Sequence, residues 1–204
     1  MEGSNDVEAR FARNDQRKMK RLFDISVCCV LLVVTLVPML LIALVIKGTS
    51  KGPVLYLSSR VGCNNRLFNM LKFRTMLIDT PAVATHLLQD PKAVLTPVGS
   101  FLRTTSLDEL PQLFNILKGQ MSLVGPRPAL FNQEDLILLR TQEGVHNLVP
   151  GLTGWAQVNG RDELSTPEKV KLDKEYLINR SFFFDLKIIY LTLIKVLYRE
   201  GVSH

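Results

Sequence analysis

The stretch ISVCCVLLVVTLVPMLLIALVI, Ile25–Ile46, decides the fold because it is almost wholly apolar. As a helix it is long enough to cross the hydrocarbon core of a bilayer, which takes about 20 residues. Segments rich in lysine and arginine stay on the cytoplasmic side, so basic flanks on both sides predict that both ends lie on one face of a membrane. The flanking residues are Arg17, Lys18, Lys20 and Arg21 before the stretch and Lys47, Lys51 and Arg60 after it.

Pro38 lies inside the apolar stretch. It has no N–H to donate to the Val34 carbonyl, and its ring disfavours helical geometry at Val37. A helix bent at this point could enter the bilayer and return to the same side. The alternative is an ordinary spanning helix that tolerates the proline, and the pattern by itself leaves both open. A cleaved signal peptide is not favoured, because no small-residue cleavage pattern follows Ile46.

Size and charge narrow the class of protein. Beyond the apolar stretch, the 204 residues leave room for one domain of about 150 residues. A net charge of +6 suits an anionic membrane surface or phosphorylated substrates. No nucleic-acid-binding signature is present, so nucleic acid is not expected as a partner. Cys28, Cys29 and Cys63 have neither disulfide nor metal-ligand spacing, which is typical of a reducing compartment.

The pattern outside the apolar stretch predicts a helix-rich α+β fold with a small β-hairpin. Gly62 and Asn64-Asn65 mark a turn between two strand-like runs over 54–76. The last predicted helix, which we expect Asp185 to cap, carries many apolar residues. That helix either packs into the core or lies as an amphipathic helix in the headgroup layer. The other predicted elements are a helix and loop over 79–97, helices over 106–118, 130–141 and 167–179, and a loop or short strands over 149–161.

The strongest candidate for chemistry is the run Ser106–Leu113, SLDELPQL. Its leucines recur at helical spacing and define a buried face, so Asp108 and Glu109 fall off that face near the helix N-terminus. The helix dipole there favours carboxylates and bound anions alike. The alternative is a capping box formed by Ser106 and Glu109. Pro111 makes the first turn irregular where the acids lie.

Basic residues that could bind phosphate surround this run. Each alone could be a solvated charge, but together they could supply the fork-shaped donors that a diphosphate needs. No P-loop or dinucleotide fingerprint is present, which argues against a kinase or a dehydrogenase. The candidates are Lys72, Arg74, Arg103, Arg127 between two prolines, and Arg161 at the end of a glycine-rich stretch.

Five motifs together resemble a known family. They are Lys20–Asp24 (KRLFD), Lys72–Met76 (KFRTM), Ser106–Gln112 (SLDELPQ), Gly125–Pro128 (GPRP) and Gly151–Trp155 (GLTGW), in that order. In this respect the chain resembles the bacterial sugar transferases, specifically the small monotopic phosphoglycosyl transferases, over about residues 18–202.

The resemblance implies an enzyme that transfers a sugar 1-phosphate from a UDP-sugar to undecaprenyl phosphate and releases UMP. It implies a covalent aspartyl-phosphosugar intermediate, a requirement for Mg²⁺ and a role in initiating membrane-linked glycan assembly. It also implies that the membrane helix is re-entrant, with the protein on the cytoplasmic face of the bacterial inner membrane. The expected organisation is a polar arm over 1–17, a re-entrant helix over 18–48 broken near Pro38, and a cytosolic catalytic domain over 49–204. The resemblance leaves open the sugar and whether copies of the chain associate.

Roles follow from the resemblance residue by residue. Asp108 would be the nucleophile and a ligand of Mg²⁺, and Glu109 its acidic neighbour. Some relatives have serine before the proline of the membrane helix where this chain has Val37, so no hydroxyl at that position assists a bend. The remaining matches are Arg103 and Arg127 as phosphate-binding residues, Lys72, Arg74, Gln157 and Arg161 as substrate-binding residues with less defined roles, and Asp173 and Tyr176 without an assigned role.

Two other functions compete with a transferase. A bitopic protein whose basic domain only binds anionic lipid or polysaccharide would have its flanks on opposite sides of the membrane. A membrane-bound hydrolase would use Asp108 and Glu109 as acid and base. Neighbouring residues on a helix diverge by about 100°, so they are poorly placed to flank one scissile bond.

Overall fold

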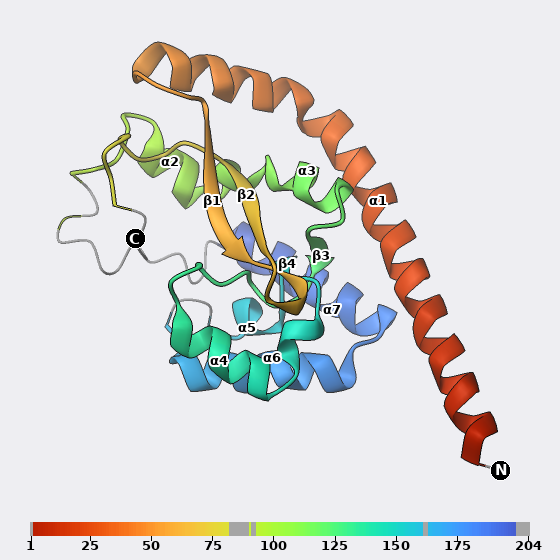
Figure 1. Ribbon diagram of the computed structural model, residues 1–204. Helices are drawn as coiled ribbons and strands as arrows, with labels where there is room; N and C mark the ends of the chain where they lie inside the picture. The colour runs from red at the N-terminus through yellow and green to blue at the C-terminus, as the bar shows by residue number, and fades with distance from the viewer. Residues whose placement is uncertain (1, 82–89, 91–92, 161–162, 199–204) are drawn as a thin grey trace.

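The computed structural model describes residues 2–81, 90, 93–160 and 163–198. Arg161 and most of the helix predicted within 79–97 lie outside these residues. Within the described part, helices dominate and two small two-stranded sheets accompany them, so the predicted helix-rich α+β class is confirmed (Figure 1).

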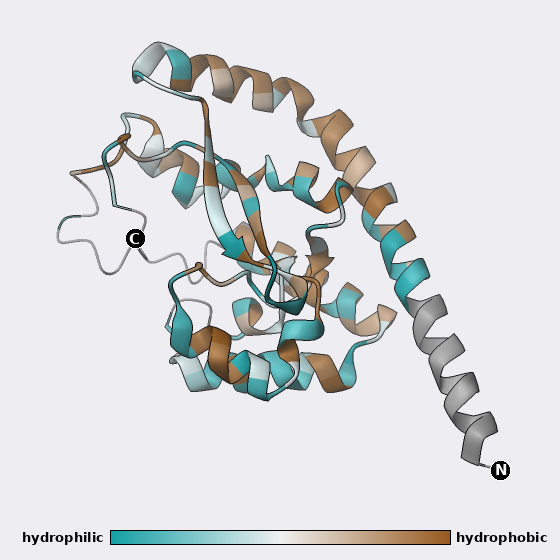
Figure 2. Ribbon diagram, in the orientation of Figure 1, coloured by the Kyte–Doolittle hydropathy of each residue, from teal (hydrophilic) through white to brown (hydrophobic). Residues whose placement is uncertain are grey.

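The first element, α1, is one helix of 48 residues over Glu2–Thr49. It includes residues 2–17, so the described part of the predicted polar arm is helical and continuous with the apolar segment; the division of the chain at residues 17 and 48 stays a prediction. Its part Arg17–Thr49 is long and apolar enough to span a membrane. Apolar side chains on this part, such as Val33 at 78% and Leu44 at 69% exposure, have no cover from the rest of the described chain (Figure 2).

Helix α1 continues through Pro38 without interruption, so the helix has no break at the predicted position. Figure 1 shows instead that α1 changes direction toward the end leading to β1. Thr35, one turn before Pro38, donates its hydroxyl to the Leu31 carbonyl at 2.7 Å. Such a bond to the carbonyl four residues back bends helices, so Thr35 supplies the hydroxyl that the residue before Pro38 lacks.

Both ends of the apolar stretch pack on the same domain. Near the first end, Cys28 is fully buried and its thiol donates to the Leu113 carbonyl at 3.1 Å. Two turns earlier, Arg21 donates to the carbonyls of Ile116 and Leu117. At the other end, Ile46 is fully buried in a cluster with Phe73 and Leu102.

The predicted β-hairpin is confirmed. Strands β1 (Leu55–Val61) and β2 (Leu67–Phe73) pair antiparallel, and η1 (Cys63–Asn65) makes the turn between them. Asn64 and Asn65 adopt φ of 54° and 57°, the left-handed region that asparagine tolerates better than most residues. Since side chains alternate along a strand, Tyr56, Ser58 and Arg60 share one face, and Tyr56 pairs with Lys72 of β2. This face turns toward the acidic run.

The helix predicted over 106–118 forms only in its second half. Helix α2 (Gly99–Thr104) is followed by η3 (Leu107–Glu109) and α3 (Gln112–Leu117), with Pro111 at the start of α3. Ser106 has φ of 55° and makes no side-chain capping bond, so a turn precedes the acids in place of a helix N-terminus. Gly119, with φ of 77°, ends α3 as predicted.

The second half of the chain surrounds a short parallel sheet. Strands β3 (Ser122–Val124) and β4 (Gly151–Thr153) pair in parallel, which agrees with the short strands predicted over 149–161. Helix α6 (Thr166–Asn179) matches its prediction and starts with a capping box between Ser165 and Glu168. The remaining elements are α4 (Glu134–Gln142), which begins four residues later than predicted, η4 (Val145–Asn147), α5 (Trp155–Val158) and α7 (Phe182–Tyr198).

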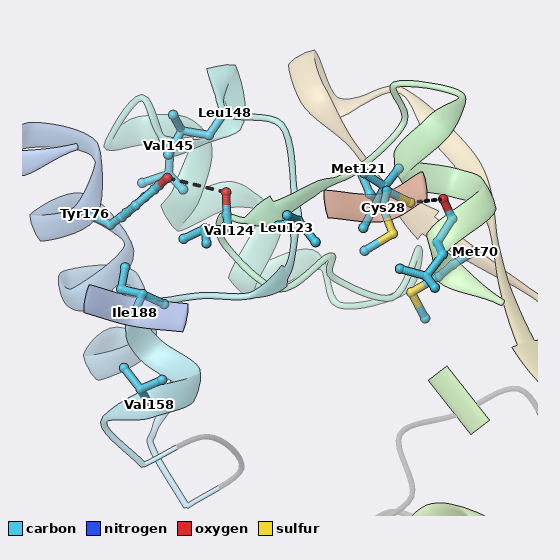
Figure 3. Close-up of a cluster of buried hydrophobic side chains, with 12 residues drawn as sticks. Cys28, Met70, Met121, Leu123, Val124, Val145, Leu148, Val158, Tyr176 and Ile188 are labelled. Carbon is cyan, nitrogen blue, oxygen red and sulfur yellow. Dashed lines mark hydrogen bonds between the residues drawn. The ribbon is translucent and has the colours of Figure 1, made fainter. Parts of the chain in front are cut away.

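One hydrophobic core joins the membrane helix to the rest of the domain. Figure 3 shows it extending from Cys28 and Met70 through Leu123 and Val124 toward Tyr176. The Tyr176 hydroxyl lies 3.4 Å from the Val124 carbonyl and donates to Asp185 at 2.7 Å. The core therefore fixes α1, β2, β3 and α6 relative to one another.

Helix α7 starts three residues before Asp185, so the predicted cap at Asp185 is wrong. Its carboxylate is buried and binds Lys20 of α1 at 2.5 Å as well as the Tyr176 hydroxyl. The helix buries Ile188 completely but exposes Phe183 and Tyr190. Core packing thus accounts for one side of α7, and the apolar side chains opposite have no cover within the described chain.

Candidate active site

A strained turn carries the two adjacent acids. Ser106 adopts its left-handed conformation directly after α2, and its carbonyl accepts the Glu109 N–H at 3.2 Å. Holding a non-glycine residue in this region costs about 1 kcal/mol, and the surrounding structure must enforce it. The turn leaves the Asp108 side chain buried, at 7% exposure of the residue, between α2 and α3.

Four of the predicted site residues meet at this turn. The Lys72 Nζ atom, from β2, lies 2.7 Å from Glu109 Oε1 and 3.5 Å from Asp108 Oδ2. Arg127 donates from Nη2 to the same Glu109 Oε1 at 2.9 Å. Glu109 therefore binds cations from two other segments, and the capping box with Ser106 is wrong. The cluster contains two carboxylates and two cations.

The two acids have opposite electrostatic environments. Burial raises the pKa of Glu109, but Arg127 and Lys72 together outweigh burial and hold the pKa well below its usual range. Burial also raises the pKa of Asp108; Lys72 offsets only part of this, and the Glu109 charge raises the pKa further. Glu109 is thus a fixed anion that orients the two cations, whereas Asp108 is the more basic carboxylate and the better nucleophile.

Arg127 extends from a loop that hydrogen bonds to neighbouring elements hold in place. The loop Gly125–Pro128 follows β3, and the Gly125 N–H donates to the Thr153 carbonyl of β4 at 2.9 Å. A Cβ atom at Gly125 would lie 2.4 Å from the Val149 carbonyl oxygen, so only glycine allows this close approach of the two chain segments. The Arg127 carbonyl accepts Nη1 of Arg140 at 2.8 Å.

Arg60 and Arg140 contact this loop, and sequence reasoning did not assign either of them to the site. Arg60 Nη1 donates to the Pro128 carbonyl at 3.2 Å. Burial, followed by the nearby Arg127 charge, lowers the pKa of Arg60 to about 10, so Arg60 stays charged at neutral pH. The alternation of β1 could have indicated Arg60, because it shares a face with Tyr56, which pairs with Lys72. No signal in the sequence marked Arg140.

Two other predicted site residues, Arg74 and Gln157, make their hydrogen bonds away from the acids. Arg74 is buried and donates to the Pro53 carbonyl at 2.7 Å and to the Ser50 hydroxyl at 2.9 Å, so it fastens the hairpin to the end of α1. Gln157, in α5, has its Nε2 atom 3.4 Å from the Leu152 carbonyl, and its Oε1 is buried without a hydrogen-bond partner. Arg103 lies half-buried in the last turn of α2, and Arg161 falls outside the described residues.

The two carboxylates at the turn, Asp108 and Glu109, could hold Mg²⁺ only together with ligands from outside the protein. Among the described residues, no group of three or more His, Cys, Asp or Glu side chains could hold a metal ion. Protein Mg²⁺ sites often use one or two carboxylates together with substrate phosphates and water. Asp108 and Glu109 fit that arrangement, in which the ion arrives with a phosphorylated substrate.

An apolar helix packed on the domain and two carboxylates that share two cations are compatible with chemistry on phosphorylated substrates at a membrane. The chain belongs to the bacterial sugar transferase family, whose model matches residues 15–199. The predicted family is therefore confirmed. Over 187 residues the chain is 44% identical to EpsL of Bacillus subtilis, an uncharacterized sugar transferase; the match covers 91% of this chain and 90% of that protein.

Two longer relatives carry more specific names. The undecaprenyl-phosphate glucose phosphotransferase of Komagataeibacter xylinus is 46% identical over 85% of this chain and 35% of its own length. The UDP-glucose:undecaprenyl-phosphate glucose-1-phosphate transferase of Escherichia coli is 42% identical over 88% of this chain and 40% of its own length. The chain thus spans less than half of these two relatives, and their activities belong to the whole proteins.

Proposed function

We propose that this chain is a phosphotransferase that moves a sugar 1-phosphate from a UDP-sugar to undecaprenyl phosphate and releases UMP. Family membership and the names of the relatives support the class of reaction. One observation carries the proposal: the buried carboxylate of Asp108 lies 3.5 Å from Lys72, beside a glutamate whose charge Lys72 and Arg127 compensate. This arrangement suits a carboxylate nucleophile that must attack a phosphorus atom surrounded by anionic oxygens.

In the first step, an Asp108 oxygen attacks the phosphorus that bears the sugar. A bond from the carboxylate to phosphorus forms, and the bond from that phosphorus to the bridging oxygen of the diphosphate breaks. UMP leaves with the electron pair of the broken bond, and the sugar phosphate remains on Asp108 as an acyl phosphate. The raised pKa of Asp108 favours this step, because a more basic carboxylate is a stronger nucleophile.

In the second step, a phosphate oxygen of undecaprenyl phosphate attacks the same phosphorus. The bond to Asp108 breaks, the free carboxylate is restored, and undecaprenyl diphosphate sugar forms. The covalent route separates a soluble donor from a lipid acceptor in time, so one site can serve both. The product would start the assembly of a membrane-linked glycan.

The cations of the cluster stabilise charge during both steps. Arg127 has a planar, fork-shaped guanidinium suited to phosphate oxygens, and Glu109 fixes its orientation through a 2.9 Å bond. Lys72 lies between the two carboxylates and can follow the negative charge as it moves from Asp108 to the phosphoryl group. Mg²⁺, held by Asp108 and Glu109 together with the substrate diphosphate, would offset the repulsion between carboxylate and phosphate.

We place this chemistry on the cytoplasmic face of the inner membrane, with α1 as a re-entrant helix. Cys28 and Ile46, near opposite ends of the apolar stretch, are both fully buried against one domain. A helix that crossed the bilayer would carry its two ends to opposite sides, where a single folded domain could not meet both. The change of direction in α1 (Figure 1) and the basic flanks agree with a return to the same side.

The decisive experiment measures nucleotide release from a panel of UDP-sugars by purified protein with undecaprenyl phosphate in detergent, with and without Mg²⁺. We expect UMP release that Asp108→Asn abolishes, while circular dichroism and the thermal midpoint of the variant stay those of the parent protein. Without the lipid acceptor, intact-mass analysis should detect a sugar-phosphate adduct that Asp108→Asn lacks. Release of UDP, or normal turnover by Asp108→Asn, would overturn the proposed mechanism.

A further inference from the structure

Three successive carbonyl groups of the loop that carries Arg127 each accept one donor from a different element. The Pro126 carbonyl accepts the Gly151 N–H of β4 at 2.9 Å. The Arg127 carbonyl accepts Arg140 Nη1 of α4 at 2.8 Å, and the Pro128 carbonyl accepts Arg60 Nη1 of β1 at 3.2 Å. Pro126 and Pro128 have no N–H to donate. The backbone of this loop is therefore held by donors from other elements that bind its carbonyl groups.

Arg140 is itself held in a single orientation. Its Nε and Nη2 atoms donate to Oδ2 of Asp173 in α6 at 2.9 and 2.6 Å, and Asp173 is 1% exposed. A guanidinium is planar, so two donors fixed on a buried carboxylate determine where the third one points. That third donor, Nη1, meets the Arg127 carbonyl. Helix α6 therefore determines the position of the Arg127 backbone through Arg140.

Arg60 repeats this arrangement from the other side of the loop. Its Nε donates to the Ser58 hydroxyl at 3.0 Å, which leaves Nη1 for the Pro128 carbonyl. The neighbouring Val61 N–H also donates to the Ala129 carbonyl at 3.0 Å. Charge-assisted donors are stronger than neutral ones, and here two of them flank the backbone of Arg127.

We propose that Arg60, and Arg140 held by Asp173, are positioning residues that orient the Arg127 guanidinium toward Glu109 and the transferring phosphate. This inference rests on the proposed function, since it gives Arg127 a task in phosphoryl transfer. Neither positioning residue touches the reacting atoms. Their effect on turnover passes through Arg127, and misplacing a catalytic group by about 1 Å lowers rates about a hundredfold.

The test uses lysine substitutions that keep the charge but remove the fork. In Arg140→Lys a single nitrogen cannot donate to Asp173 and to the Arg127 carbonyl in the same geometry. The charge opposite the buried Asp173 remains, so the variant should fold. Arg60→Lys tests the opposite side of the loop independently. The matched control is Lys174→Ala, because the ion pair of Lys174 in α6, at 2.5 Å, is with Glu143 at the end of α4 and not with a residue of the loop.

We expect Arg140→Lys and Arg60→Lys each to lower kcat for UMP release about 10- to 100-fold, with a smaller change in KM for the UDP-sugar. Lys174→Ala should leave both constants unchanged. In an Arg127→Ala background, either lysine substitution should change kcat less than about twofold, because the residue being positioned is gone. Circular dichroism and thermal midpoints check that each variant is folded.

The outcomes separate this inference from the proposed function. If the parent protein releases UMP through Asp108 but the effects of Arg140→Lys and Arg127→Ala multiply independently, the positioning role is wrong and the proposed function stands. The same holds if Arg140→Lys and Arg60→Lys both turn over normally. If the parent protein releases no UMP from any donor, both proposals fall together. Loss of kcat that disappears in the Arg127→Ala background supports the inference.

Discussion

Replacing Lys72 by methionine should move the pH dependence of turnover in a direction that the structure determines. The ammonium lies 3.5 Å from Asp108 Oδ2, and at an effective dielectric constant near 20 two unit charges at that distance attract by about 5 kcal/mol before screening by solvent. A neighbouring cation of this kind typically lowers a carboxyl pKa by about one to three pH units. Burial already raises the pKa of Asp108, and the substitution removes the group that offsets this most.

The sign follows from the role of the carboxylate. In the proposed mechanism Asp108 attacks only when ionised, so activity should fall as the pH drops through the pKa of Asp108 in the folded protein. With Lys72 gone, that pKa rises, and the acidic limb of kcat/KM should shift by about one to three pH units toward neutrality. The acidic limb reports the titration of Asp108 and Glu109 together, so the pH at which the limb falls is the quantity to compare between the variants.

The assay follows UMP release from pH 5 to 9 for the parent protein, Lys72→Met and a control, Lys118→Met. Lys118 is exposed at the end of α3, so its removal should leave the limb where it is. The plateau of kcat/KM above the acidic limb should also be lower for Lys72→Met, because Lys72 can bind phosphate. The height of this plateau does not test the electrostatic reasoning. An acidic limb at the same pH in Lys72→Met and the parent protein would refute the electrostatic reasoning.

Two further predictions concern the anchoring of α1. Arg74→Gln should lower the free energy of unfolding by about 2–3 kcal/mol, because the Ser50 and Pro53 oxygens lose the charged donor that the buried Arg74 supplies; thermal denaturation measures this. Collapse of kcat without loss of stability would instead assign Arg74 to the site. Single cysteines at Arg17 and Lys51, in a chain whose own cysteines are serine, should both resist an impermeant maleimide in intact cells and react after permeabilisation. Labelling of one position alone in intact cells would establish a bitopic helix.

Local patterns in the sequence were sufficient for elements that local interactions determine. Asn64 and Asn65 in the turn, with alternating strands on either side, predicted the hairpin because turn chemistry and side-chain alternation act over a few residues. Helix α6 also begins at a local signal, the capping box between Ser165 and Glu168, which the predicted bounds of this helix did not use. The same capping pattern at Ser106 and Glu109 was misleading, because Glu109 binds Lys72 and Arg127 instead. These two cations come from distant segments of the chain. Long-range ion pairs override a local cap, and a linear pattern does not contain them.

The candidate site was predictable where a motif supplied it and not where the fold did. The resemblance assigned Asp108, Glu109, Lys72 and Arg127, and the structure brings these four together. Arg74 also belongs to a motif, yet it holds backbone and hydroxyl oxygens near the end of α1. A motif records that a residue matters to the family, and it does not distinguish a group that binds substrate from one that holds the fold.

The electrostatic difference between the two adjacent acids is the clearest case of information that only the fold contains. In the sequence, Asp108 and Glu109 are neighbours of similar chemistry. In the structure, Glu109 has one cation at 2.7 Å and another at 2.9 Å, whereas Asp108 has Lys72 at 3.5 Å. This asymmetry holds the pKa of Glu109 low and leaves that of Asp108 raised. In the proposed mechanism the better compensated acid therefore anchors the site and the less compensated one is the nucleophile. Exchanging the two side chains, as Asp108→Glu with Glu109→Asp, should therefore lose activity although charge and composition are unchanged.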